Sequence, residues 1–331
     1  KGIKISQNNY PYSFELAEVF NLKGDKLAMI SEYLDVLETN DSYIQTVQNA
    51  LQTSFNNESN PQQNELLKTE LLKRIQKNPD RTILSELLIW MQIQLKDWEG
   101  AFVQAKALDK RKKEDGARIM GMAQLFAQNE SYDIAMRAYQ YVLTKGKGNY
   151  FYTDARKELL NVTYQKITKK GNYTAIELGE LEKNYMATID ELGKTAGTVA
   201  LLKNLAHLQA FYLNKTKEAI DLLEETIELP QIEPHLRANC KLELGDILLV
   251  TGDIWEASLR YSQVEKEFKH DAIGQEAKFR NAKISYYSGD FKWSQSQLDV
   301  LKGATSKLIA NDAMDLSLLI NNVGMNIRKP T

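Results

Sequence analysis

The 331-residue chain has one cysteine, Cys240, so no disulfide can form within it. It has six prolines and few alternating runs of β-branched residues, a composition that argues against a β-sheet fold. No run of about 18 uncharged apolar residues is present, so no transmembrane helix is predicted. The formal net charge is −2 and the pI is about 6.1, so charge does not favour nucleic acid or an anionic membrane as a partner.

Motifs of enzymes and metal sites are also missing. The three histidines, His207, His235 and His270, are far apart, and no Cys-x-x-Cys or His-x-x-x-His spacing accompanies them. Residues 145–148 read Lys-Gly-Lys-Gly, but no strand precedes them, so a flexible connector is predicted rather than a phosphate loop. No Gly-x-Ser-x-Gly element occurs. We therefore expect no catalytic activity, no metal, no cofactor and no small-molecule substrate.

The sequence does contain helical hairpins, and residues 241–268 show the pattern most clearly. Apolar residues recur there every three or four positions, as on one face of a helix. Gly252 is expected to end the first helix because glycine readily adopts positive φ, and Asp253 to cap the second helix. Gly245 and Ala257 are small, which predicts a close crossing of the two helices.

The run Leu244-Gly245-x-x-Leu248, followed by Ala257-x-x-x-Tyr261, resembles the tetratricopeptide repeat, whose signature is Leu-Gly-x-x-Tyr and then Ala-x-x-x-Phe. Related patterns occur along the chain around Gly24-Asp25, Lys96-Asp97, Tyr132, Leu205-Ala206 and Gly289-Asp290. The resemblance implies an all-α, right-handed α-solenoid of about eight helical hairpins, closed by a capping helix over residues 306–322. The alternative for this last helix is the first half of a further repeat.

The whole chain, residues 1–331, is predicted to be one superhelix. Two regions fit the repeat less well: residues 41–77 resemble a degenerate hairpin, and residues 150–193 a long, irregular one. They suggest a subdivision into N-terminal repeats over residues 1–145, the irregular hairpin over 150–193, and C-terminal repeats with the cap over 197–331.

In the tetratricopeptide-repeat family the first helix of each hairpin lines the concave face, where ligand peptides bind. The resemblance therefore implies a protein or peptide partner in a concave groove of mixed apolar and polar character. An alternative is that these side chains only support the superhelix. The residues expected on this face are Glu86, Trp90, Ile93, Gln124, Lys203, His207, Asp246, Phe279, Lys283 and Tyr286.

Other aromatic and charged residues are assigned structural roles. Trp98, Trp255 and Trp293 begin second helices and are predicted to pack against the adjacent repeat. A basic run over residues 106–118 and an acidic run over 218–233 are predicted to be solvated surfaces. The alternative for each run is a docking patch for an oppositely charged partner.

The sequence thus favours a non-catalytic scaffold or adaptor that binds a protein. The alternative is a structural module of a larger bacterial cell-envelope protein. Nucleic-acid binding through the basic segments is disfavoured by the net charge. Residues 279–320 also resemble a segment of long, exported tetratricopeptide-repeat proteins of Bacteroidota. That resemblance favours a periplasmic or envelope location over the cytoplasm, with membrane attachment only through an N-terminal signal or anchor outside this sequence.

Overall fold

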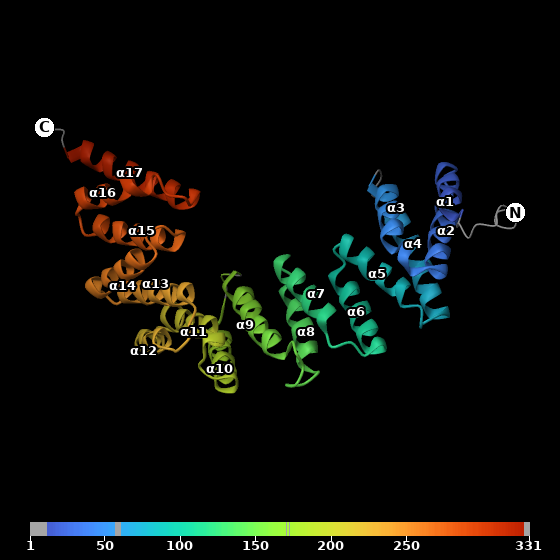
Figure 1. The fold of residues 1–331 in the computed structure, drawn as a ribbon, viewed down its shortest axis with the longest axis horizontal. Coiled ribbons are helices and arrows are strands. Elements are labelled where there is room, and N and C mark those ends of the chain that lie inside the picture. The colour runs from blue at the N-terminus through green and yellow to red at the C-terminus, as the bar shows by residue number, and fades with distance from the viewer. Residues whose placement is uncertain (1–11, 57–60, 170, 172, 328–331) are drawn as a thin grey trace. The chain divides into compact units, whose positions relative to one another are not determined.

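The computed structural model describes residues 12–56, 61–169, 171 and 173–327, and every regular element within these residues is helical. Two short 3-10 helices, η2 (Asp41–Tyr43) and η3 (Ala196–Thr198), accompany the α-helices. The α-helices are α1 (Ser13–Leu22), α2 (Lys26–Thr39), α3 (Ile44–Asn56), α4 (Pro61–Lys77), α5 (Thr82–Gln94), α6 (Trp98–Lys112), α7 (Ala117–Gln128), α8 (Tyr132–Leu143), α9 (Tyr152–Lys169), α10 (Ala175–Leu192), α11 (Val199–Phe211), α12 (Thr216–Ile227), α13 (Pro234–Val250), α14 (Ile254–Glu267), α15 (Ala272–Tyr287), α16 (Phe291–Leu301) and α17 (Lys307–Ile327) (Figure 1).

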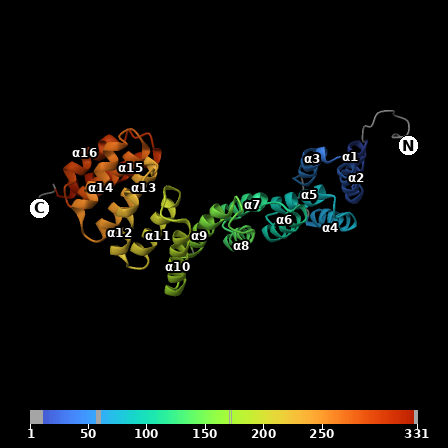
Figure 2. The same ribbon diagram turned by 60° about the horizontal axis from the view of Figure 1, so that its bottom comes forward.

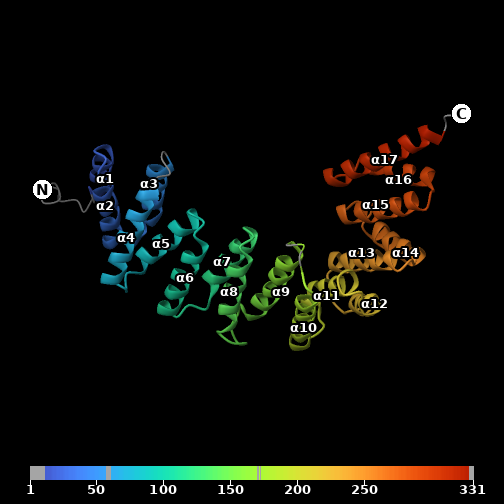
Figure 3. The same ribbon diagram turned by 180° about the vertical axis from the view of Figure 1, so that it is seen from behind.

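Most of the predicted hairpins are present, but the degenerate hairpin predicted over residues 41–77 is not found among the described residues: α3 and α4 each pack mainly on α2 and α5. The pairs α1–α2, α5–α6, α7–α8, α11–α12, α13–α14 and α15–α16 pack as hairpins, and α17 packs on α15 and α16 (Figures 1 and 3). The two long helices predicted within residues 150–193 are α9 and α10, each of 18 residues. The prediction of an all-α helical-repeat fold is confirmed.

The chain divides into two compact units, which are described separately: unit 1, Lys1–Lys166, and unit 2, Ile167–Thr331. The boundary falls near the end of α9. The predicted arrangement of the whole chain as one superhelix stays a prediction.

Five of the six packed hairpins share one turn conformation, and the α11–α12 turn is one residue longer, with the Lys215 N–H donating to the Gln209 carbonyl. In each turn a residue with positive φ precedes the second helix, and a backbone N–H then reaches back into the first helix: Asp253 N–H, for example, donates to the Leu248 carbonyl at 2.9 Å. An aspartate caps the second helix at Asp25, Asp97, Asp253 and Asp290. The residues with positive φ are Gly24, Lys96, Glu130, Asn214, Gly252 and Gly289.

The lysine at one of these turns is expected to be a stability defect. Lys96 has φ 55°, a left-handed conformation that costs a side-chain-bearing residue about 1–2 kcal/mol. Lys96→Gly should therefore raise the local free energy of unfolding by about 0.5–1 kcal/mol, after the larger unfolded-state entropy of glycine is subtracted. Hydrogen exchange of the α5 and α6 amides measures this change.

The reverse substitution at the equivalent position is the control. Gly252 has φ 89°, so Gly252→Ala should lower the free energy of unfolding of the α13–α14 hairpin by about 1 kcal/mol. Equal stability of Lys96→Gly and the parent protein would contradict the strain assigned to Lys96.

Among the described residues of unit 2, one apolar cluster spans α11 to α15 and another spans α15 to α17. Gly245 lies where α13 crosses α14, and a Cβ added there would approach Tyr261 Cε1 to 2.4 Å. Tyr261 is 1% exposed, so the close crossing predicted at Gly245 is confirmed, with the tyrosine ring filling it. Figure 2 shows the resulting layers, with first helices α13 and α15 beside second helices α14 and α16.

A histidine bridge ties the starts of two first helices in unit 2. Glu233 caps α13 and Asp271 caps α15. His235 Nδ1 lies 3.1 Å from Glu233 Oε1, and His235 Nε2 lies 2.9 Å from Asp271 Oδ2. The hydrogen bonds to Asp271 and then Glu233 raise the pKa of His235. The backbone N–H of His235 lowers the pKa of Glu233, and the His235 side chain lowers that of Asp271.

This bridge predicts a pH-dependent contribution to stability. Because the folded-state pKa of His235 is raised, its contribution is complete below the unfolded value of about 6.5 and is lost as pH rises through the raised pKa. The carboxylates have lowered pKa values, so their contribution is present above about pH 4 and is lost as pH falls through those values.

The melting temperature of His235→Gln should therefore lie below that of the parent protein at about pH 5.5, and the gap should shrink by about pH 8.5. His270→Gln is the matched control, since His270 is exposed. A gap for His235→Gln of the same size at both pH values would contradict the charged bridge.

Candidate binding surface

The first helices of unit 2 form a continuous layer, because α11 contacts α13, α13 contacts α15, and α15 contacts α17. We call the surface of α11, α13 and α15 that carries the predicted residues the first-helix face. It is defined by Lys203, His207, Glu243, Asp246, Arg280, Lys283 and Tyr286.

Charges on the first-helix face alternate in sign from helix to helix. On α11, His207 Nδ1 lies 2.7 Å and Lys203 Nζ 3.9 Å from the carboxylate of Glu243 on α13. One turn further along α13, Asp246 accepts from Arg280 of α15 and from the Tyr261 hydroxyl at 2.6 Å. Three of the predicted residues, Lys203, His207 and Asp246, thus belong to hydrogen bonds and ion pairs that link α11 to Glu243 of α13, and Asp246 of α13 to α15.

Burial changes the pKa of the Asp246 carboxylate on α13. It raises the pKa of Asp246, although the Arg280 charge and the Tyr261 hydrogen bond act in the opposite direction. It also raises the pKa of Tyr261, and the neighbouring Asp246 raises it further, so the phenol stays protonated and donates to the carboxylate. These contacts hold the Asp246 side chain in one position.

Glu243 and Arg280 are the members of the face that sequence analysis missed. Each lies about one repeat from its partner: Glu243 is 36 residues after His207, and Arg280 is 34 residues after Asp246. Opposite charges at the repeat spacing were the available signal, because equivalent positions of adjacent repeats become neighbours in a stacked fold.

Aromatic rings flank this charged network. The ring centroid of His207 lies 4.7 Å from that of Phe211, which is 40% exposed at the end of α11. Tyr286 packs against Tyr287 and Phe291, with ring centroids 5.3 and 5.6 Å away. The first-helix face therefore offers partly exposed aromatic groups at both sides of its charges.

The remaining predicted residue of unit 2 is in the core. Phe279 is 8% exposed and packs in the apolar cluster formed by α15, α16 and α17. Lys283 Nζ lies 5.0 Å from the centre of its ring. Phe279 supports the packing of these helices and positions the Lys283 ammonium.

The four predicted residues of unit 1 lie on α5 and α7. Glu86 accepts hydrogen bonds from Lys112 and Arg118 at 3.3 Å each. Trp90 and Ile93 are partly buried against apolar clusters of unit 1, and Gln124 is exposed on α7. The cations that hold Glu86 belong to the basic run 106–118, so part of this run is used in packing adjacent helices.

The tryptophans at the starts of second helices differ from one another. Trp98 packs as predicted, with its ring centroid 5.7 Å from that of Phe126 in the next hairpin. Trp255 is 88% exposed and Trp293 is 59% exposed, so the packing prediction is wrong for both. Single exposed apolar side chains are common on protein surfaces, so exposure alone assigns neither tryptophan a role.

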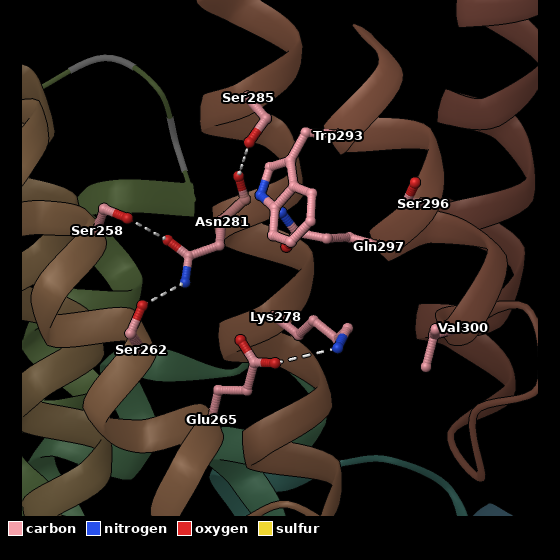
Figure 4. A pocket seen from close by; sticks show the side chains of 10 residues that line it. All are labelled: Ser258, Ser262, Glu265, Lys278, Asn281, Ser285, Trp293, Ser296, Gln297 and Val300. Atoms are coloured by element: carbon pink, nitrogen blue, oxygen red, sulfur yellow. Dashed lines mark hydrogen bonds and ion pairs between the residues drawn. The ribbon is translucent and has the colours of Figure 1, made fainter. Parts of the chain in front are cut away.

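Trp293 lies at the edge of a groove on the other layer of unit 2 (Figure 4). This groove, of about 420 Å³, runs between second helices α14 and α16 with α15 as its floor. Its buried amide, Asn281, is fully engaged: Oδ1 accepts from Ser258 Oγ at 2.9 Å, and Nδ2 donates to Ser262 Oγ at 3.1 Å. The buried amide of this groove therefore already has hydrogen-bond partners within the protein.

The described part of the chain also bears on metal binding, membrane insertion and nucleophilic chemistry. Within it, no group of three or more His, Cys, Asp or Glu side chains is placed to hold a metal ion. No helix among these residues is both long and apolar enough to cross a membrane. Cys240 is fully buried, and this burial raises the pKa of its thiol to about 11, as expected for a core residue rather than a nucleophile.

Comparisons with known proteins concern the fold. No protein-family model matches the chain, and no curated protein sequence matches it. Solved structures similar to it include YrrB, a tetratricopeptide-repeat protein described as having an unusual peptide-binding site. The identity is 17%, the alignment covers 65% of this chain and 98% of YrrB, and the TM-score is 0.41.

Two further structures belong to the same class. A tetratricopeptide-repeat protein from Parabacteroides merdae is 16% identical over 80% of this chain and 95% of its own, with a TM-score of 0.35. A chain of the APC/C hetero-tetramer Cut9–Hcn1 is 13% identical over 96% of this chain and 57% of its own, with a TM-score of 0.46. These similarities are to tetratricopeptide-repeat folds. They do not identify a ligand, so the binding site is inferred from the residues of this chain alone.

Proposed function

We propose that the protein is a non-catalytic scaffold that binds a protein partner through the first-helix face of unit 2. The main support is a network of contacts between helices, in which His207 and Lys203 contact Glu243, and Arg280 pairs with Asp246. Side chains held in this way lose little rotamer freedom when a ligand binds, which favours affinity.

The composition of the face suits an extended polypeptide. Phe211 lies one turn after His207 on α11, and Tyr286 lies about one turn after Lys283 on α15, so an aromatic ring accompanies the polar groups of each outer helix. Aromatic and arginine side chains contribute most of the binding energy at many protein interfaces, and charges set the register of the partner. A segment with alternating charges and an apolar residue near each end would match this order.

A peptide selection tests the proposal without knowledge of the natural partner. A displayed random-peptide library is selected on the intact protein, and the binders are measured against Lys203→Ala/Tyr286→Ala. Their affinity should fall by about tenfold or more. Lys266→Ala/Lys292→Ala is the matched control, because both lysines are exposed on second helices. Binders with equal affinity for both double variants would place the site elsewhere.

A second candidate function is a structural module of a larger envelope assembly. It is favoured by α17, whose Leu308, Leu318 and Leu319 are 71%, 60% and 53% exposed. A helix that only closes a stack is expected to present a polar outer surface. Sedimentation of the protein and of Leu308→Lys/Leu318→Lys tests this candidate: self-association lost in the variant would support it, and identical monomers would count against it. The envelope location itself stays a prediction from sequence.

A further inference from the structure

A second groove of unit 2 lies between second helices α10 and α12, with α11 as its floor, and has a volume of about 460 Å³. It occupies the same place in its hairpins as the groove of Figure 4 does between α14 and α16. We call it the α10–α12 groove. Its volume lies in the range of about 300–1,000 Å³ that is typical of ligand sites.

The floor and one wall of this groove are apolar. Ile189 of α10 is 5% exposed and Leu205 of α11 is 4% exposed, while Met186 of α10 is 49% exposed. Leu222 of α12 completes this surface. A flexible methionine beside buried aliphatic groups adapts to apolar side chains of different shapes.

The rim is acidic. Asp190, Glu218, Asp221 and Glu225 line the groove, against the single cation Lys194, which pairs with Glu225. Three of these carboxylates come from the acidic run 218–233. Among the described residues, Asp190, Glu218 and Asp221 have no ion-pair partner. The rim therefore keeps a net negative charge beside an apolar floor.

A buried amide marks the polar end of the groove. Gln209 of α11 is 7% exposed and lines the groove. Its Nε2 donates to Glu182 Oε1 at 3.1 Å, and Lys215 Nζ holds the same carboxylate at 2.6 and 2.9 Å. A carboxylate only accepts hydrogen bonds, so the amide nitrogen must face Glu182. The oxygen, Gln209 Oε1, is left buried without a hydrogen-bond donor among the described residues.

A buried acceptor of this kind keeps its desolvation cost unless a donor reaches it. The corresponding amide in the groove of Figure 4, Asn281, has both its atoms satisfied by serine hydroxyls. The two grooves thus differ in the hydrogen bonding of their buried amides. Both polar atoms of Asn281 have partners, whereas Gln209 Oε1 has no donor among the described residues.

We propose that the α10–α12 groove binds a polypeptide segment in which basic residues flank a large apolar residue. The apolar side chain would lie on Leu205, Ile189 and Met186. The flanking arginine or lysine side chains would meet the acidic rim, and one donor would reach Gln209 Oε1. This site lies on the second-helix layer and does not depend on the first-helix face.

Labelled synthetic peptides test the proposal directly by fluorescence anisotropy on the full chain. The probe is a hexapeptide of alternating arginine and leucine. Comparison peptides alternate arginine with serine, or glutamate with leucine. The arginine–leucine peptide should bind at least about tenfold more tightly than either, since it alone satisfies both charge and apolar contact.

Two variants locate the binding. Glu218→Gln/Asp221→Asn should weaken binding of the arginine–leucine peptide by about tenfold, and Gln209→Met, which removes the acceptor at similar size, by about fivefold or more. Glu228→Gln is the matched control, because it removes one charge of the same acidic run outside the groove. Circular dichroism confirms that each variant is folded.

The contradicting results are equally specific. Equal binding of the arginine–leucine peptide to the parent and the double variant would overturn the proposal. Equal affinity for the arginine–serine peptide would also overturn it, because binding would then need only charge attraction. Displacement of the probe by spermidine at a concentration equal to the Kd of the arginine–leucine peptide would overturn it for the same reason. Peptides selected for the first-helix face keep their affinity for the groove variants, so the two proposals fail separately.

Discussion

Replacing Lys145 by methionine is expected to lower the free energy of unfolding of unit 1 by about 3–5 kcal/mol. Lys145 Nζ lies 2.6 Å from Asp109 Oδ2, and the Asp109 side chain is completely buried. Tyr141 donates to the same oxygen at 2.6 Å. Without the lysine, a buried carboxylate would keep its desolvation cost and lose its counter-ion, which is the origin of the large loss.

A double-mutant cycle separates this cause from lost packing. Asp109→Leu/Lys145→Met replaces the buried pair by apolar groups and should fall within about 1 kcal/mol of the parent protein. Lys110→Met, an exposed lysine on the same helix as Asp109, should change stability by no more than about 0.5 kcal/mol. Hydrogen exchange of α6 and α8 gives the free energies. A double variant as unstable as Lys145→Met would contradict the charge explanation.

Gly274→Ala is expected to cost about 3 kcal/mol in unit 2, because the added methyl has no space. Gly274 lies in the first turn of α15, and a Cβ there would come within 2.0 Å of the Phe268 carbonyl oxygen and 2.6 Å of its carbon. Both are backbone atoms at the end of α14, so neither can rotate away. Relief requires α15 to move relative to α14, and α15 carries Arg280, Lys283 and Tyr286.

Gly179→Ala is the matched control in the same unit. Gly179 lies within α10, and nothing lies within 4 Å of its added Cβ. This substitution should raise the free energy of unfolding by up to about 1 kcal/mol, since alanine is the better helix former. Hydrogen exchange should therefore show lower protection in α14 and α15 for Gly274→Ala and higher protection in α10 for Gly179→Ala. Equal protection of α15 in Gly274→Ala and the parent protein would contradict the close contact.

The repeat fold could be read from the sequence because its signals are local. Gly252 ends a helix by its positive φ, Asp253 caps the next one, and Gly245 admits a large neighbour. Each of these effects acts within a few residues, so a single sequence carries it. Gly274 escaped notice because its role depends on the carbonyl of Phe268, whose position is set by the bend between α14 and α15.

The candidate site was only partly predictable. The residues of the first-helix face follow from helical spacing, but Glu243 and Arg280 enter through contacts between repeats. Trp98 directly follows the capping Asp97, whereas Trp255 is the second residue after the capping Asp253, so the two rings project from different sides of their helices. Trp98 packs on Phe126, and Trp255 is 88% exposed. This offset is visible in the spacing from each capping aspartate, but the ring that covers Trp98 belongs to the next hairpin, which no spacing within one helix specifies.

The most direct test of the central claim is to locate a selected peptide on unit 2 by hydrogen exchange. The account predicts that the peptide increases protection in α11, α13 and α15 around His207, Asp246 and Lys283, and that Lys203→Ala/Tyr286→Ala abolishes this increase. Protection confined to second helices α12, α14 and α16, unchanged in that variant, would contradict the assignment of binding to the first-helix face.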